Sequence, residues 1–302
     1  MNILMNGLNS FTGILLAKNL LKKGHRVIAL SSGNPKRLNS LQKNELENIK
    51  NNKSFTLLVN NYNLDNKSFL YDFKENIDIF IIHGFKALDY KNLKLNSITL
   101  LKDSLLWLEP LPKLLKDRSC KLVTYTGTYF ENFIPELQTP YSLSKSMGWL
   151  YVKKLFSEFK LLKYLLINPY GSLESKKFTA SIINKWINEE SVNLEFPYLI
   201  RDNMPAEFLI DDYINNIENF LDNNYSIREY SPSYIVETNL EFSLKFSSKL
   251  KNYGYQCDLN ISNNKLCNTV TGKNSVREKY IHLEDAFIED YLKKAILNNK
   301  KN

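Results

Sequence analysis

The sequence predicts an α/β fold with a doubly wound parallel sheet, because short apolar runs alternate along the chain with stretches of helical apolar spacing. After an initial strand, helix and strand, further strands are expected at residues 55–59, 77–82, 120–124 and 164–167. From Ser172 onward this alternation loosens. We therefore expect a main domain over residues 1–171, to which residues 205–240 partly return, and a smaller region over residues 172–302.

The first thirty residues contain a complete strand, turn, helix and second strand. Residues 2–5 are an apolar run, residues 14–23 have helical spacing that ends at Gly24, and residues 25–30 have the pattern of a buried strand. In the turn, Gly7 permits a tight backbone and Gly13 lets the helix pack closely on the strand. The free N–H groups at the start of such a helix can bind a pyrophosphate. The unit therefore predicts a Rossmann-type nucleotide site.

The turn supplies six of the expected cofactor contacts. Ser10 stands where the middle glycine of such a turn is usual, so its hydroxyl could donate a hydrogen bond to a phosphate. We also include Gly84, just after the strand at 77–82. The expected contacts in these two places are Gly7, Asn9, Ser10, Phe11, Thr12, Gly13 and Gly84.

Cofactor preference can be judged at the end of the second strand, where a carboxylate would bind the ribose of NAD and repel the extra phosphate of NADP. Residues 31–37 contain no acid but have two hydroxyls and two cations. This favours NADP over NAD, and for Lys36 a basic, solvated loop is an equal alternative. The candidate phosphate ligands are Ser31, Ser32, Lys36 and Arg37.

Tyr141 and Lys145 are four residues apart in a stretch of helical pattern. On a helix such residues lie on one face, one turn apart. An ammonium group there favours the phenolate and lowers the pKa of the tyrosine from about 10 toward neutrality. Downstream of a nucleotide site, this spacing predicts a phenol that donates a proton.

With these motifs the chain resembles the extended short-chain dehydrogenase/reductase family, also called the epimerase/dehydratase family, which acts on nucleotide sugars. The resemblance also includes Thr126 at the end of a strand, Asn96 in a helix, the Asn168-Pro169-Tyr170-Gly171 segment, and residues 208–212. Within the family the chain is most similar to the short-loop nucleotide-sugar 4-ketoreductases of dideoxysugar and O-antigen synthesis, such as CDP-paratose and CDP-abequose synthases. Residues 126–141 and 177–183 carry that closer likeness.

The resemblance implies roles for individual residues. Tyr141 would donate a proton to the carbonyl oxygen, and Thr126, with Thr128 as second choice, would hold that oxygen. Lys145 would lower the pKa of Tyr141 and bind the nicotinamide ribose, while Asn96 would order a water molecule that replaces the proton. Asn168 would contact both cofactor and substrate. The remaining substrate contacts implied are Thr128, Lys177, Phe178 and Arg201.

These roles fit NADPH-dependent reduction of the 4-keto group of a nucleotide-linked hexose. A 4-epimerase of the same family is the alternative, followed by a non-catalytic NADP sensor and a dehydrogenase of small alcohols or ketones. Dehydration is disfavoured, because Gly127 and Thr128 stand where 4,6-dehydratases carry an acid and a base. The chain also departs from the family at residues 205–207, where Pro-Ala-Glu replaces an Arg-Asp pair that lies upstream at Arg201-Asp202.

Composition excludes several other classes. The net charge of +8 is spread among many Asn residues without a dense basic run, so we do not expect nucleic-acid binding. The three Cys and three His residues are widely separated, which predicts free thiols and no metal site. Without a membrane span or a signal peptide, a cytoplasmic protein is expected. The resemblance implies a homodimer formed by the helix carrying Tyr141 and the helix after Asn96.

Overall fold

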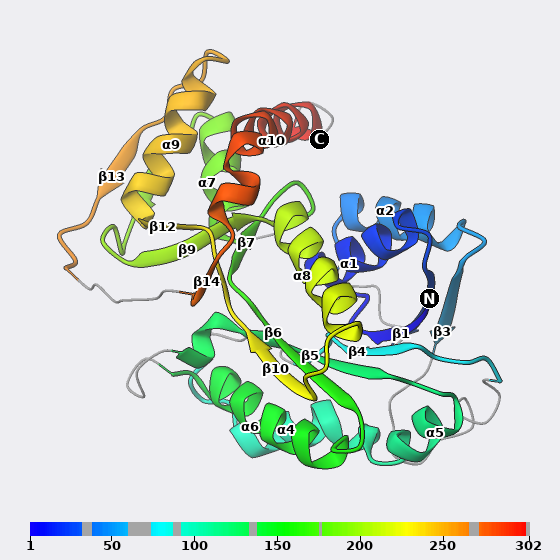
Figure 1. Cartoon of the computed structure of the whole chain (residues 1–302). Coiled ribbons are helices and arrows are strands. Elements are labelled where there is room, and N and C mark those ends of the chain that lie inside the picture. Colours follow the sequence, from blue (N-terminus) through cyan, green and yellow to red (C-terminus); the bar gives the residue numbers. More distant parts are fainter. Residues whose placement is uncertain are drawn as a thin grey trace. The chain divides into compact units, whose positions relative to one another are not determined.

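The computed structural model describes residues 1–31, 38–59, 74–86, 92–132, 138–174, 177–265 and 272–299. The chain divides into two compact units (Figure 1). The first comprises Met1–Leu166 and Ile210–Tyr230, and the second comprises Ile167–Leu209 and Ser231–Asn302. The segment that returns to the first unit is therefore shorter than the expected residues 205–240.

The first unit is built on a seven-stranded parallel sheet with the order β10-β6-β5-β4-β1-β2-β3. Two consecutive runs extend in opposite directions from β1, as a doubly wound sheet requires. The predicted α/β fold with a parallel sheet is thus confirmed. Its strands are β1 (Asn2–Asn6), β2 (Arg26–Ser31), β3 (Phe55–Val59), β4 (Ile79–Ile82), β5 (Leu122–Thr128), β6 (Lys160–Leu166) and β10 (Ile227–Tyr230).

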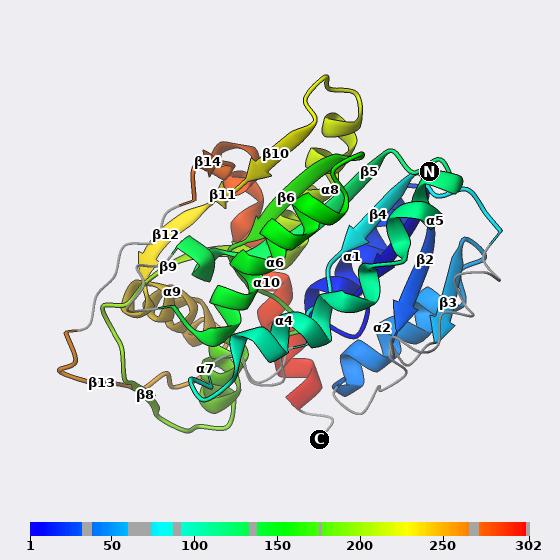
Figure 2. The same cartoon turned by 90° about the horizontal axis from the view of Figure 1, so that it is seen from below.

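Helices cover both faces of this sheet (Figures 1 and 2). On one face lie α1 (Phe11–Lys22), α2 (Ser40–Lys50) and the part of α8 (Ala206–Leu221) that belongs to this unit. On the other lie α4 (Ser97–Leu105), α5 (Leu111–Asp117) and α6 (Pro140–Leu155). Two short 3-10 helices, η2 (Leu106–Leu108) and η3 (Tyr129–Asn132), connect these elements.

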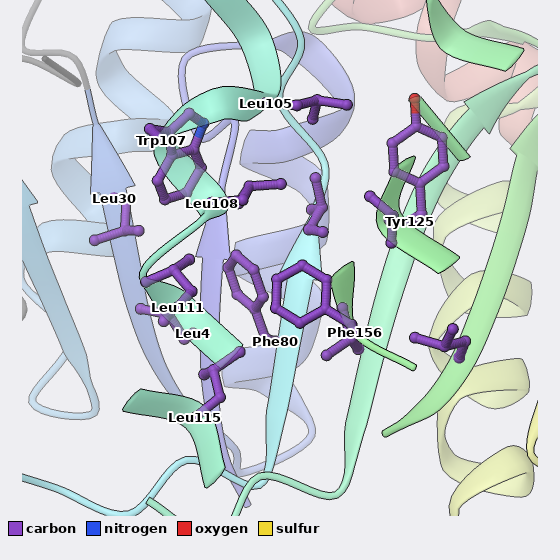
Figure 3. Packing of buried hydrophobic residues seen from close by; sticks show 14 of the residues in the cluster. Leu4, Leu30, Phe80, Leu105, Trp107, Leu108, Leu111, Leu115, Tyr125 and Phe156 are labelled. Carbon is purple, nitrogen blue, oxygen red and sulfur yellow. The ribbon is translucent and has the colours of Figure 1, made fainter. Parts of the chain in front are cut away.

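A hydrophobic core fills the space between the sheet and the α4–α6 face (Figure 3). Phe80 of β4 lies at its centre, with its ring centroid 6.3 Å from Trp107 and 6.2 Å from Phe156. All four residues of β4 are buried, because helices cover the strand from both sides. This burial holds β4 firmly in the sheet, so the residues that follow its carboxyl end are also held in place.

The second unit has smaller sheets. β12 (Ile235–Thr238), β9 (Ile200–Pro205) and β7 (Asn168–Tyr170) form one, β11 (Pro232–Ser233) pairs with β14 (Asn274–Ser275), and β13 (Leu259–Ile261) pairs with β8 (Val192–Leu194). Its helices are α7 (Phe178–Ile187), α9 (Asn239–Lys251) and α10 (Arg277–Asn299). They enclose a core of aliphatic and aromatic residues around Trp186, Phe242 and Phe246.

Candidate active site

The turn after β1 is built around glycines that nothing larger can replace. Gly7 has φ +82°, and a Cβ on it would lie 2.4 Å from the backbone N of Gly84. A Cβ on Gly13 would lie 2.1 Å from the carbonyl O of Gly7. Gly84 is as tightly placed, because a Cβ on it would lie 2.7 Å from the Cα of Gly7. The turn and the loop after β4 are therefore in backbone contact, and a dinucleotide can approach this backbone closely.

Ser10 is the N-cap of α1. Its Oγ accepts a 3.0 Å hydrogen bond from the N–H of Gly13 and donates to the carbonyl O of Gly7 at 2.9 Å. We expected this hydroxyl to donate a hydrogen bond to a phosphate. In the structure it donates instead to the Gly7 carbonyl within the turn. The first turn of α1 carries no acidic residue, so the positive end of the helix dipole remains available to an anion. These features fit a nucleotide pyrophosphate. Phe11 and Thr12, the next expected contacts, are buried at this helix end.

Asn9 connects the turn to the end of β2. Its Nδ2 donates a 2.9 Å hydrogen bond to the Oγ of Ser31, so two of the expected cofactor contacts touch each other. Ser32, Lys36 and Arg37 lie outside the described residues.

Asn6 is a residue of this site that the sequence analysis missed. Its Oδ1 accepts hydrogen bonds from the N–H groups of both His83 and Gly84, each at 2.7 Å. The side chain therefore fixes the loop after β4 against the turn after β1. A polar residue directly after the apolar residues of a buried strand was the available signal.

Tyr141 and Lys145 both lie on α6, as predicted. The helix begins with a capping box in which Thr139 Oγ1 accepts from the N–H of Ser142 at 3.2 Å. Tyr141, in the first turn, is half-buried, and its ring forms a T-shaped pair with the Phe85 ring at 5.9 Å between centroids. Lys145 is buried, and its Nζ lies 4.9 Å from the centroid of the same Phe85 ring. Phe85 thus contacts both members of the pair.

The ammonium group of Lys145 also donates a 2.6 Å hydrogen bond to the backbone carbonyl of Thr126 and lies 5.2 Å from the ring centroid of Tyr125. Burial lowers the pKa of Lys145 to about 8. A cation with so low a pKa is uncommon on a protein surface and typical of a functional site. Lys145 is thus positioned at the carboxyl end of β5, at the same edge of the sheet as the glycine turn.

The hydroxyl of Thr126 is directed away from α6. Its Oγ1 lies 2.9 Å from the Tyr213 hydroxyl of α8 and 3.1 Å from the Nδ1 of His83. The Nε2 of His83 is hydrogen-bonded to Thr12 Oγ1 at 2.9 Å, so a buried polar chain runs from α1 to α8 through β4 and β5. Burial lowers the pKa of His83 to about 3, and its imidazole is therefore neutral. Lys145 therefore contacts Thr126 through the backbone carbonyl of Thr126. A catalytic role for the Thr126 hydroxyl stays a prediction.

Thr128 and Asn96 occupy simpler environments. Thr128 is buried at the end of β5, and its N–H donates a 2.8 Å hydrogen bond to Glu131 Oε1. Asn96 is exposed and is the N-cap of α4, where its Oδ1 accepts from the N–H of Thr99 at 2.9 Å. Asn96 was expected within a helix, ordering a water molecule, whereas the structure gives its side chain a capping bond just before the helix.

The other expected substrate contacts belong to the second unit. Asn168 donates a 2.6 Å hydrogen bond to Asn203, and Arg201 is half-buried on β9. Lys177 precedes α7, where burial lowers its pKa, and the charge of Glu174 opposes this. Phe178 begins α7, with its ring centroid 6.2 Å from Phe242. Asp202, next to Arg201, is buried and accepts from the N–H of Tyr234 at 2.7 Å.

Comparison with known proteins rests on structure. No protein-family model matches the sequence, and no curated protein is similar to it at a significant level. Among solved structures, UDP-glucose 4-epimerase from Stenotrophomonas maltophila, with NAD and a formylated UDP-arabinopyranose, aligns with a TM-score of 0.74 at 12% identity over 100% of both chains. The chain has the fold of the nucleotide-sugar epimerases.

Two further epimerases align over nearly their whole length. UDP-glucose 4-epimerase from Bifidobacterium longum, with NAD and UDP, has a TM-score of 0.70 at 16% identity and covers 100% of this chain and 99% of its own. A variant of UDP-glucuronic acid 4-epimerase from Bacillus cereus, with NAD and a fluorinated UDP-sugar, has a TM-score of 0.65 at 15% identity over 98% and 99%. At this identity the likeness shows the fold alone, an α/β fold with a Rossmann-type parallel sheet.

Two other features of the described residues bear on function. None of the helices among them is long and apolar enough to span a membrane. The described part of the chain also contains no cluster of three or more His, Cys, Asp or Glu residues that could hold a metal ion. The thiols of Cys120 and Cys257 are free, and Cys267 lies outside the described residues.

Proposed function

We propose that the protein is a nucleotide-sugar 4-epimerase that uses a nicotinamide dinucleotide. The observation that carries this proposal is the buried Lys145, which shares the Phe85 ring with Tyr141 at the end of β5. The turn of Gly7 and Gly13 and the loop of Gly84, where an added Cβ would clash with the backbone, lie at the same edge of the sheet. An acid–base pair beside a dinucleotide turn fits hydride transfer at a carbon that bears a hydroxyl.

The residues of this chain would move the proton in such a reaction. A bound nicotinamide would supply the hydride chemistry, taking a hydride from C4 of the sugar and returning it. Tyr141 would accept the proton of the C4 hydroxyl during oxidation and give it back to the 4-keto oxygen when the hydride returns to the opposite face of C4, which inverts that carbon. Lys145 would stabilise the phenolate of Tyr141 before it accepts this proton and after it has returned it, because a buried ammonium interacts strongly with a nearby negative charge.

The three similar structures described above contain NAD, and we therefore propose NAD as the first cofactor to test. Those proteins are named as UDP-sugar 4-epimerases, which favours epimerisation over net reduction. A 4-keto-hexose reductase that uses NADPH is the second candidate. It is favoured by one feature of the sequence, the absence of any acid between Ser31 and Arg37.

The test offers the purified protein UDP-glucose or UDP-glucuronic acid with NAD, and separates the 4-epimers by chromatography. We expect epimer formation without net cofactor consumption. Parallel reactions contain CDP-, dTDP- or GDP-4-keto-6-deoxyhexoses with NADPH or NADH. Stoichiometric loss of absorbance at 340 nm there would assign the reductase instead. Cofactor binding without turnover in either set would indicate a non-catalytic sensor.

A matched pair of variants distinguishes chemistry from packing. Tyr141→Phe removes only the phenol oxygen and should lower kcat by at least about 100-fold. Tyr151→Phe removes the same atom from the same helix, where the hydroxyl reaches Glu109 at 3.4 Å, and should leave kcat unchanged. Equal effects of the two substitutions would contradict the assignment of Tyr141.

A further inference from the structure

A buried carboxylate, Glu131, lies beside the end of β5 on η3. Its Oε2 forms a 2.8 Å ion pair with the Nζ of Lys163 on β6, and both side chains are almost fully buried. Its Oε1 accepts the 2.8 Å hydrogen bond from the N–H of Thr128. The hydroxyl of Ser146, which follows Lys145 on α6, lies 3.4 Å from Oε2. Glu131 therefore contacts β5, β6 and α6 at the place where Lys145 is held.

Gly127 leaves the space in which this ion pair sits. A Cβ on Gly127 would lie 2.7 Å from Glu131 Oε1 and 3.1 Å from the Cε of Lys163. Successive residues of a strand point to opposite faces, so Gly127 faces the same side as Tyr125, toward α6. The absence of a side chain at residue 127 thus allows an acid from η3 to reach the catalytic side of the sheet. In the sequence, Gly127 indicated only that no acid stands at residue 127. The contribution of Glu131 was not predicted.

The charges around Lys145 come from several elements. Lys163 of β6 and Glu131 of η3 are buried with it. The titratable phenol of Tyr125 lies against it, and Tyr141 lies one turn before it on α6. His83, beyond β4, is neutral. Farther out, Glu229 of β10 lies 3.7 Å from Lys163 and 3.8 Å from Lys153, and it is half-exposed. Among the described residues named here, Glu131 is therefore the buried acid that offsets two buried cations.

We propose that Glu131 is a positioning residue that keeps Lys145 protonated in its buried site, so that Lys145 can act on Tyr141. The relevance to catalysis rests on the proposed function, but the effect on Lys145 does not. In support, burial is the largest influence on the pKa of Lys145 and lowers it, the charge of Glu131 raises it, and the charge of Lys163 lowers it. The acid and the second lysine thus act on Lys145 in opposite directions.

Two substitutions should consequently move the titration of Lys145 in opposite directions. Glu131→Gln keeps the shape of the side chain but removes its charge, so the pKa of Lys145 should fall by at least about half a unit. Lys163→Met keeps the aliphatic stem but removes the competing cation, so the pKa of Lys145 should rise. If Glu131 and Lys163 affected Lys145 through packing alone, the two substitutions would not shift its pKa in opposite directions.

The experiment uses the full chain labelled with [13Cε]lysine and follows each lysine by NMR from pH 6 to 11, with the Lys145 signal assigned by its loss in Lys145→Arg. Glu158→Gln is the matched control, because Glu158 is an exposed acid paired with Lys116 and should leave Lys145 unchanged. Unshifted midpoints, or shifts of equal sign in the two variants, would overturn the proposal. Circular dichroism checks each fold, and if Glu131→Gln does not fold, absence of an upward shift in Lys163→Met overturns the proposal by itself.

A second measurement connects the charge to catalysis. In the epimerase assay, kcat should fall at a lower alkaline pH in Glu131→Gln than in the parent protein, by the same shift that NMR measures for the pKa of Lys145. Glu131→Asp keeps the charge and should reverse part of this shift. Opposite NMR shifts in a protein that epimerises no sugar would leave the electrostatic role intact and contradict the proposed function. Epimerisation with unshifted Lys145 midpoints would contradict the role of Glu131 alone.

Discussion

The ammonium group of Lys145 donates to the backbone carbonyl of Thr126, whereas the hydroxyl of Thr126 is bound to Tyr213 on the opposite face of the sheet. One residue at the end of β5 therefore contacts α6 through its main chain and α8 through its side chain. Substitution of the side chain at residue 126 should therefore leave the hydrogen bond that holds Lys145 in place.

Lys145→Met should lower kcat by at least about 100-fold without destabilising the protein at pH 7. The pKa of Lys145 is lowered from its ordinary 10.5 to about 8 by burial, so between these values the unfolded chain binds a proton that the folded chain does not. The free energy of unfolding of the parent protein should therefore rise with pH from 8 to 10.5, and that of the variant should not. Urea unfolding across this range measures both, and a parallel rise in the two proteins would contradict the interpretation.

Thr126→Val should destabilise the protein by about 1–3 kcal/mol, because it removes the partner of the buried His83 Nδ1 and one partner of the buried Tyr213 hydroxyl, which keeps Thr124 Oγ1 at 3.1 Å. Thr126→Ser should retain most of that stability. Since the hydroxyl already has two partners, we expect kcat of the folded Thr126→Val protein to fall by less than about tenfold. A fall of about 100-fold or more at unchanged stability would instead support a catalytic hydroxyl at residue 126.

His83→Gln should make the protein less sensitive to acid. Burial lowers the pKa of His83 to about 3 from 6.5 in the unfolded chain, so the unfolded state binds the extra proton between these values. Stability is therefore lost as the pH falls from 6.5 toward 3, by up to about 1.4 kcal/mol for each pH unit. Unfolding by urea at several acidic pH values should show a shallower slope in the variant. His282→Gln, an exposed site on α10, is the control and should retain the parental slope.

Gly13→Ala should abolish cofactor binding, because its Cβ would lie 2.1 Å from the Gly7 carbonyl in the middle of the proposed pyrophosphate turn. We expect a destabilisation of about 1–3 kcal/mol as well. Gly24→Ala is the control: it has φ +82° but no atom within 4 Å of its Cβ position, so it should cost about 1–2 kcal/mol and leave binding unchanged. Calorimetric titration with NAD and NADPH measures the affinities, and full binding by Gly13→Ala would exclude this turn as the site.

The homodimer implied by the family resemblance can be tested on α4 and α6. Ile98 of α4 and Leu143 and Leu150 of α6 are exposed apolar side chains, and we propose that a second copy of the chain covers them. Leu150→Glu should convert a dimer to a monomer in light scattering after gel filtration. Leu244→Glu, at another exposed leucine, on α9, should leave the dimer intact. A parent protein that is monomeric at all concentrations would contradict the proposal.

Local patterns made much of the first unit predictable. Strand and helix periods, together with the glycines that end or begin elements, depend on residues close in the chain, and they located the unit from β1 to β2 and the turn at Gly7 and Gly13. The spacing of Tyr141 and Lys145 is likewise a property of one helix. Their approach to Phe85 confirms that they share an environment. Their catalytic roles stay predictions.

What the sequence by itself determined was thus the α/β class, the glycine turn after the first strand and a tyrosine–lysine pair on one helix, because each depends on neighbours within a few residues. Only the tertiary structure decided the contacts between distant residues. Tyr213 takes the hydroxyl of Thr126 from 87 positions away, and Asn6 holds the loop of His83 from 77 positions away. Glu131 and Lys163 meet above Gly127 because β5 and β6 are paired, so that side chains far apart in the sequence share one buried, low-dielectric space.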